Sequence, residues 1–153
     1  MKTRNDTPSV FDRLMQKETA ISKNIRHNLS ALLNTRRFPA LALDQSGNPD
    51  PALTRYGLSE MSAVNADDEI ARNALLAVIA QQVSIFEPRL RQVKVFIPEK
   101  QPASRRRLEL VIEAELHNAA ERKILAFRSV LDLASCLIQL EEPYAERISC
   151  ALS

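Results

Sequence analysis

The hydrophobic pattern of this chain changes its period at Pro88, which divides the sequence into a helical part and a strand part. Asp67 and Asp68 are good helix N-caps, and apolar residues follow them at helical intervals. Residues 74–80 are apolar on every side, so we expect this helix to be covered on more than one face, at the centre of the domain. Pro88 ends it, because the residue before a proline is pushed out of the helical region.

After Pro88, apolar residues recur at every second position. Residues 93–97 alternate as a half-buried strand does, and residues 108–116 alternate more clearly, with apolar side chains on one face and mainly glutamates on the other. A polar turn at 117–123 leads into a third strand at 124–131, and residues 136–140 could add a short fourth. This order predicts an α+β domain, with N-terminal helices packed on an antiparallel sheet of three to four strands and a buried central helix.

An amphipathic helix with one core face is predicted earlier in the chain. It should stop near Asn34, which tolerates a left-handed cap, and Arg36 and Arg37 suit the negative end of the helix dipole. Proline and glycine then indicate loops at 38–50, and a short helical turn at 52–56 should close at Gly57. The core face of the helix consists of Ile21, Ile25, Leu29, Leu32 and Leu33.

The length of 153 residues and the absence of a linker-like stretch suit a single domain. We place it at 21–140, after a polar segment at 1–20 and before a tail at 141–153 that allows a short helix or a frayed end. The N-terminus lacks the apolar region of a secretory signal, so we expect the protein in the cytosol. The apolar run at 74–80 is far shorter than the roughly 20 residues that span a bilayer.

Composition points away from nucleic acid, metal and redox chemistry. The formal net charge is only +2, which is no whole-molecule signature of nucleic-acid binding. Cys136 and Cys150 are expected to be reduced thiols, because the chain shows no secretion signal and no Cys-x-x-Cys. With only His27 and His117 available, no standard zinc spacing exists, and we expect neither a metal nor a cofactor.

Charged residues at the ends of the predicted elements allow two interpretations each. Glu87 lies at the C-terminal end of a helix, where the dipole disfavours a carboxylate, so the residues alone favour a structural pair with Arg89 over a functional site. Arg36 and Arg37 could be solvated charges at a helix end or contacts to a partner, and the residues alone favour neither role. The three arginines at 105–107 favour a solvated loop over a phosphate-binding patch.

Five segments, in their order along the chain, resemble the TssE family of bacterial type VI secretion systems, which is related to phage baseplate wedge proteins formerly called lysozyme-like. The resemblance covers roughly residues 9–140. Members of this family often have a glycine-containing turn between the last two strands, where this chain has LASC at 133–136. The segments are SVFDRL at 9–14, LLNTRR at 32–37, YGL at 56–58, FEPRL at 86–90 and FRSVLD at 127–132.

The resemblance implies a non-catalytic baseplate component that connects the wedge to the contractile sheath and helps to start sheath assembly. It assigns Glu87, Pro88 and Arg89 to docking on other baseplate subunits, with Pro88 fixing the backbone and Arg89 able to form a two-pronged bond to a carboxylate. Arg36 and Arg37 are second-tier partner contacts. The implied partners are wedge subunits of the TssF, TssG and TssK types and sheath subunits of the TssB and TssC types. A sheet edge would be extended by a sheath strand. Neither nucleic acid nor direct membrane insertion is implied, and the complex would dock at the inner membrane.

Two other classes of function are weaker. A peptidoglycan hydrolase needs two carboxyl groups in a sugar-binding cleft, one of them with a raised pKa. The chain has no Trp, and Glu87 has Pro88 and Arg89 beside it, not an apolar pocket that would keep it protonated. A small nucleic-acid-binding module lacks stacking aromatics, because Tyr56 and Tyr144 are not interleaved with basic residues.

Overall fold

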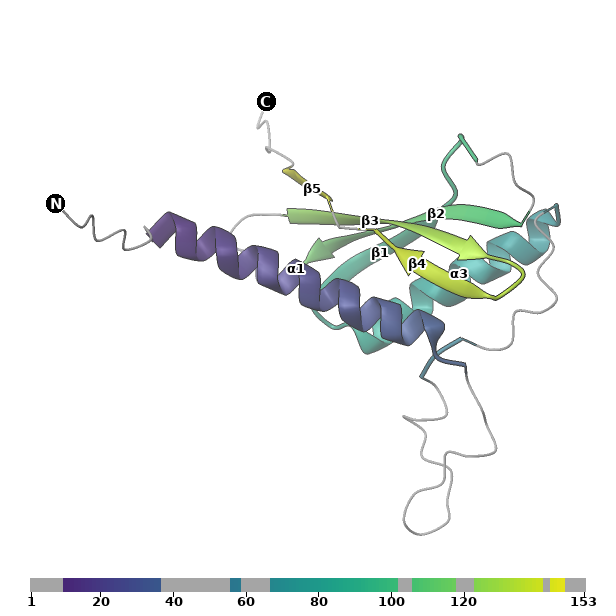
Figure 1. The fold of residues 1–153 in the computed structure, drawn as a ribbon, viewed down its shortest axis with the longest axis horizontal. Coiled ribbons are helices and arrows are strands. Elements are labelled where there is room, and N and C mark those ends of the chain that lie inside the picture. The colour runs from purple at the N-terminus through teal and green to yellow at the C-terminus, as the bar shows by residue number, and fades with distance from the viewer. Residues whose placement is uncertain are drawn as a thin grey trace, which may run out of the picture.

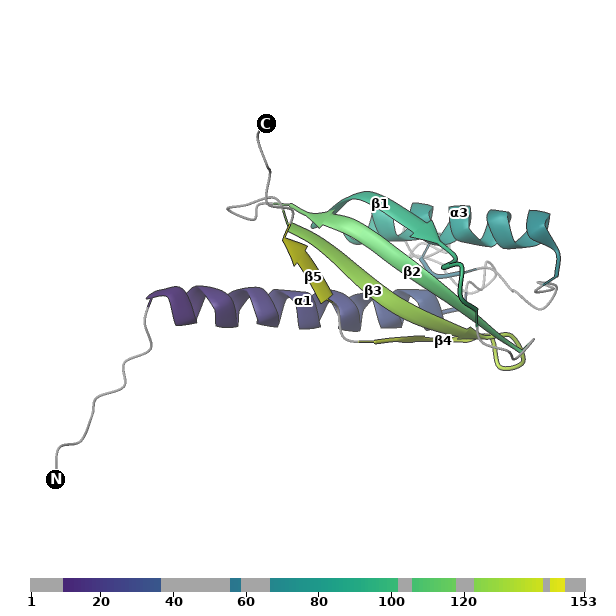
Figure 2. The same cartoon turned by 90° about the horizontal axis from the view of Figure 1, so that it is seen from above.

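The structure, a computed structural model, describes residues 10–36, 56–58, 67–101, 106–117, 123–141 and 144–147. These residues have the predicted α+β architecture, with two helices on one face of an antiparallel sheet (Figures 1 and 2). The elements are α1 (Val10–Asn34), α3 (Glu69–Phe86), β1 (Leu90–Phe96), β2 (Arg107–Leu116), β3 (Lys123–Asp132), β4 (Leu137–Leu140) and β5 (Tyr144–Arg147).

The sheet has the strand order β1-β2-β3-β4, and β5 pairs with β3 beside β4. β4 pairs with residues 129–132 of β3, and β5 pairs with residues 123–126. The expectation of a helix or a frayed end in the tail is therefore wrong for residues 144–147. The reason is that β3 is longer than β4, so its first half keeps backbone groups that β5 can satisfy.

The core lies between the helices and the inner face of the sheet. α3 packs beneath β1, and α1 packs beneath β4 (Figure 2). The alternation predicted for β2 is confirmed, since the apolar set of this strand is buried. Fully buried large side chains of this core include Ile25, Leu29, Leu33, Ile79, Ile112 and Phe127.

One side of α3 is exposed to solvent. Leu75, Ile79 and Val83 are buried, but Ala74 and Ala77 are exposed. The prediction that this helix is covered on more than one face is therefore wrong for the described residues. Alanine adds to an apolar pattern, yet it is also the best helix former and leaves little apolar surface in water.

α1 begins at Val10, well before the predicted core face at Ile21. The predicted stop at Asn34 is confirmed. The predicted left-handed cap is not, because Gln92 and Cys136 are the non-glycine residues with positive φ among those described.

Asn34 instead clamps β4. Its Nδ2 donates to the carbonyl of Ile138 at 2.8 Å, and its Oδ1 accepts from the N–H of Ile138 at 2.8 Å. The side-chain amide thus occupies both backbone hydrogen-bonding groups of Ile138 as a neighbouring strand would.

The turn between β3 and β4 forms without glycine. The Oδ1 of Asp132 accepts hydrogen bonds from the N–H groups of Ala134 at 2.9 Å and Ser135 at 3.0 Å. Cys136 takes the left-handed conformation, with φ of 55°, at the position where glycine is favoured. The sheet therefore continues into β4 despite the LASC sequence of this turn.

Several predictions fall on other parts of the chain. Arg37, Arg105, Cys150 and the loop at 38–50 lie outside the described residues, as does the helical turn at 52–56 except Tyr56. Neither helix of the described residues has the length and apolar character needed to cross a bilayer.

Candidate functional site

The Glu-Pro-Arg element is a tight corner between α3 and β1. The N–H of Glu87 still donates to the carbonyl of Val83 at 2.9 Å, and the carbonyl of Glu87 accepts from the N–H of Leu90 at 3.0 Å. On the other side, the carbonyl of Arg89 accepts from the N–H of His117 at 2.7 Å. The backbone of this corner is therefore fixed at both ends, and Pro88 is exposed at its tip.

Glu87 and Arg89 form a two-pronged ion pair within the chain. The Nε of Arg89 lies 2.6 Å from Oε1 of Glu87, and its Nη2 lies 2.7 Å from Oε2. The local pair that the residues alone favour is thus confirmed. Glu87 is only 3% exposed, whereas Arg89 is 37% exposed.

Two asparagines of α1 complete the arrangement. Asn24 accepts a hydrogen bond from Nη1 of Arg89 at 3.0 Å, and Asn28 donates to Oε2 of Glu87 at 3.3 Å. They are one helical turn apart on the same side of α1. Neither asparagine could be predicted as part of a site, because both fall among the polar residues between the core positions and only the packing of α1 against the corner gives them a role.

The environment favours the charged form of both groups. Burial alone would raise the pKa of the Glu87 carboxyl, but the hydrogen bonds from Arg89 and Asn28 and the charge of Arg89 outweigh it and lower that pKa. The hydrogen bonds to Glu87 raise the pKa of the Arg89 guanidinium despite some desolvation. The pair is therefore ionised at neutral pH, and its chemistry is that of a fixed cation with a buried counterion.

A small cavity adjoins this pair, between α1, the end of α3 and Tyr56. Its volume is about 210 Å³, and both Asn28 and Glu87 line it. The rings of Tyr56 and Phe86 meet edge to face in its wall, with centroids 5.1 Å apart and planes at 80°.

The other predicted site residues lie apart from this corner. Arg36 is half-buried and donates through Nη2 to the carbonyl of Cys136 in the β3–β4 turn. It lies beyond Asn34, the end of α1, which follows Asn28 by about 9 Å of helical rise. The structure therefore does not bring Arg36 together with Arg89, and Arg37 lies outside the described residues.

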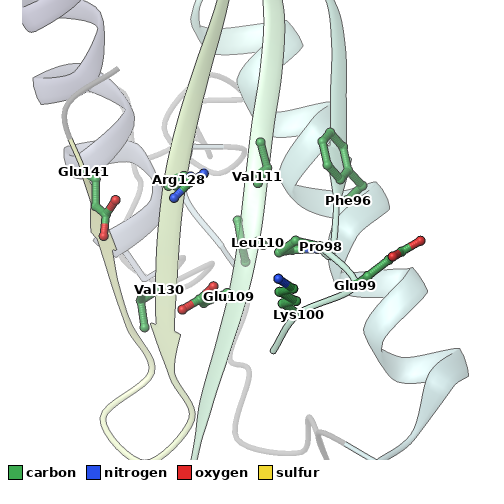
Figure 3. Close-up of a pocket in the computed structure, with 10 residues that line it drawn as sticks. All are labelled: Phe96, Pro98, Glu99, Lys100, Glu109, Leu110, Val111, Arg128, Val130 and Glu141. Carbon is green, nitrogen blue, oxygen red and sulfur yellow. The ribbon is translucent and has the colours of Figure 1, made fainter. Parts of the chain in front are cut away.

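A larger hollow of about 560 Å³ lies on the outer face of the sheet, away from the helices (Figure 3). Its lining combines glutamates, such as Glu109 and Glu141, with Lys100 and Arg128, and Phe96 is the aromatic ring among its lining residues. The sheet edge at β4 is closed beside Ile138 by the Asn34 clamp. β1 pairs only with β2 among the described strands, so its other edge carries no strand there.

Of the three arginines considered for phosphate binding, Arg106 and Arg107 are among the described residues. Arg106 and Arg107 are exposed, and Arg107 pairs in register with Asp132 across β2 and β3. Arg105 lies outside the described residues.

Comparison with known proteins identifies the chain at the family level. The family model described as "Baseplate wedge protein gp25" matches residues 19–121, which is about two-thirds of the chain and includes α3, the Glu-Pro-Arg corner, β1 and β2. No curated protein matches. No solved structure matches either. The match and the fold together show that the chain belongs to the baseplate wedge protein gp25 family, the family that also contains TssE.

Proposed function

We propose that this protein is a structural component of a type VI secretion baseplate, where it connects the wedge to the contractile sheath and helps to start sheath assembly. Its partners on this proposal are wedge subunits of the TssF, TssG and TssK types and sheath subunits of the TssB and TssC types. It works in the cytoplasm within a complex docked at the inner membrane.

The observation that carries the docking role is the fixed geometry of Arg89. The buried Glu87 holds the guanidinium from one side, and Asn24 holds it from another. More than a third of Arg89 remains exposed, next to the exposed Pro88. A preorganised cation loses little side-chain entropy on binding, so most of its interaction energy with an acidic group of a partner contributes to the free energy of binding.

Glu87 has a different role from the one expected of it. Its carboxylate is buried and occupied, so we assign it to positioning Arg89 and not to a hydrogen bond or ion pair with a partner. Pro88 and Arg89 are the residues of this corner whose exposed surface we assign to partner contact.

The sheet contributes the connection to the sheath. A strand added to a sheet needs free backbone donors and acceptors along an edge. Asn34 occupies those of Ile138 on β4, so β1 is the edge that we assign to a sheath strand.

A non-catalytic role agrees with the electrostatics of the corner. A glycosidase acid needs a raised pKa, and the pKa of Glu87 is lowered by Arg89 and Asn28. Release of soluble fragments from purified peptidoglycan by the wild-type protein, and its loss in Glu87→Gln, would overturn this assignment.

The docking role is tested by affinity purification of the tagged full-length protein from its native cell. Arg89→Glu alone would place a carboxylate against the buried Glu87, so we combine it with Glu87→Gln, which can donate to the new carboxylate. We expect the wedge subunits to be lost in Glu87→Gln/Arg89→Glu and retained in Arg13→Glu, a matched reversal at an exposed position on α1. Unchanged copurification with a folded double variant would refute docking through this corner.

The edge assignment is tested by hydrogen exchange with and without purified sheath subunits. Amide protons of β1 should gain protection when the subunits are added, whereas Ile138 should be protected in both samples. New protection confined to β4 or β5 would contradict the assignment to β1.

A further inference from the structure

Five apolar or aromatic residues and three polar ones line the cavity beside the Glu-Pro-Arg corner. Leu29 and Leu32 of α1 form its buried wall, and the half-buried rings of Tyr56 and Phe86 form another. His27 and Asn28 lie at its rim, and both are exposed. Interface hot spots have this arrangement, in which an apolar anchor is desolvated inside a ring of polar groups.

Its size suits an amino-acid side chain. The volume of about 210 Å³ is below the range of roughly 300–1,000 Å³ that is typical of small-molecule and cofactor sites. It corresponds to the volume of roughly seven water molecules in the liquid. One large apolar side chain fills such a space.

The walls are held in place without a ligand. The N–H of Leu58 donates to the carbonyl of Thr35 at 3.0 Å, and Leu58 forms a parallel bridge with Arg36. These contacts join the segment that carries Tyr56 to the end of α1. A preformed pocket avoids part of the ordering cost of binding.

The charge around the pocket favours an acidic neighbour. Residues 19–43 contain no Asp or Glu, while Lys23 is exposed on α1 one helical turn before His27, which lines the pocket. Glu87 is neutralised by Arg89 in the wall. Asn28 and Glu87 line the pocket and also bond within the Arg89 network, so the pocket and the exposed cation belong to one surface.

We propose that this pocket is the anchor socket of the docking surface. It takes one large apolar side chain from a wedge subunit, and an acidic side chain next to it in the same partner segment meets Arg89. This inference rests on the proposed docking function and adds to it the chemistry of the partner segment, an apolar residue beside a carboxylate.

The test fills the socket. Ala31 lines the pocket but is exposed on α1, so Ala31→Phe can place a ring in the space with little disturbance of the core. Ala20→Phe is the matched control, because Ala20 is exposed on the same helix and is absent from the pocket lining. The probe is the purified TssF–TssG–TssK-type wedge complex of the same bacterium, and the dissociation constant is measured together with the melting temperature.

We expect Ala31→Phe to weaken binding at least tenfold and Ala20→Phe to leave it within twofold. A second pair tests the rim without filling it. His27→Glu should weaken binding, whereas His27→Lys should maintain or strengthen it, with the difference shrinking at high salt. If Ala31→Phe lowers the melting temperature, its effect on binding could come from unfolding, and the two His27 variants then provide the test.

The outcomes separate this inference from the docking role. Loss of binding in Glu87→Gln/Arg89→Glu, with wild-type binding in Ala31→Phe and both His27 variants, would overturn the socket and leave the docking role standing. Wild-type binding in all of these variants would overturn both.

Discussion

Removing the charge of Arg89 should expose how much the Glu-Pro-Arg corner contributes to stability. Arg89→Met keeps most of the aliphatic stem but leaves the Glu87 carboxylate, which is 3% exposed, with the 3.3 Å hydrogen bond from Asn28 and a hydrogen bond from the backbone N–H of residue 89, and with no cation. A buried carboxylate without its cation is costly, because neither water nor a counterion stabilises the charge.

The magnitude follows from the burial of the two partners. Breaking a fully buried ion pair costs about 3–5 kcal/mol, whereas an exposed pair contributes about 1 kcal/mol or less. Because Arg89 is 37% exposed, water can partly replace it, and we expect a loss of about 2 kcal/mol. For a chain of this size that corresponds to a melting temperature lowered by roughly 4–8 °C.

The assay is urea unfolding followed by circular dichroism, with the slope against urea as a check on two-state behaviour. The double variant Glu87→Gln/Arg89→Met should be more stable than Arg89→Met, because it no longer buries an unpaired charge. A change of less than about 0.5 kcal/mol in Arg89→Met, or a double variant that is no more stable than the single one, would refute this account of the corner.

The remaining predictions concern acid stability and three backbone contacts. The pKa of Glu87 is lowered in the folded state, so its stabilising contribution is complete above the ordinary carboxyl pKa of about 4.3. That contribution disappears as the pH falls through the lowered pKa. The free energy of unfolding of Glu87→Gln, measured by urea titration between pH 3 and 6, should therefore depend less on pH than that of the wild type. Asn34→Ala removes both bonds to Ile138 and should cost about 1–3 kcal/mol in the same assay, and an unchanged midpoint would contradict the clamp. Gly57→Ala should cost about 2 kcal/mol or more, because φ is +92° and an added Cβ would lie 2.4 Å from the carbonyl oxygen of Thr35; wild-type stability would show that the segment adjusts freely. Cys136→Gly should raise the melting temperature through relief of about 1 kcal/mol of left-handed strain, and a lower melting temperature would mean that the half-buried thiol contributes more than the strain costs.

The sequence predicted best what depends on neighbours along the chain. The end of α3 before Pro88 and the alternation of β2 are set by local sterics and by a single buried face, and both are confirmed. The pairing of Glu87 with Arg89 was also accessible, because the two residues are two positions apart.

Contacts between distant segments could not be predicted in the same way. The bond between Asn34 and Ile138 joins residues 104 positions apart, and nothing in either local pattern marks it. β5 was missed because its strand depends on the space that a short β4 leaves on β3, not on its own alternation. The exposed side of α3 was missed because alanine has the same weight in an apolar pattern whether it faces the core or water.

The Asn34 clamp limits how many added strands one copy of this protein can accept. Where strand exchange proceeds at β1, a copy of this protein offers one vacancy to the sheath, because the opposite end of its β1–β4 strand order is already occupied by its own helix. On the proposed function, each copy would then seed a single sheath protofilament, and the number of copies in a baseplate would set the number of protofilaments in the tube above it.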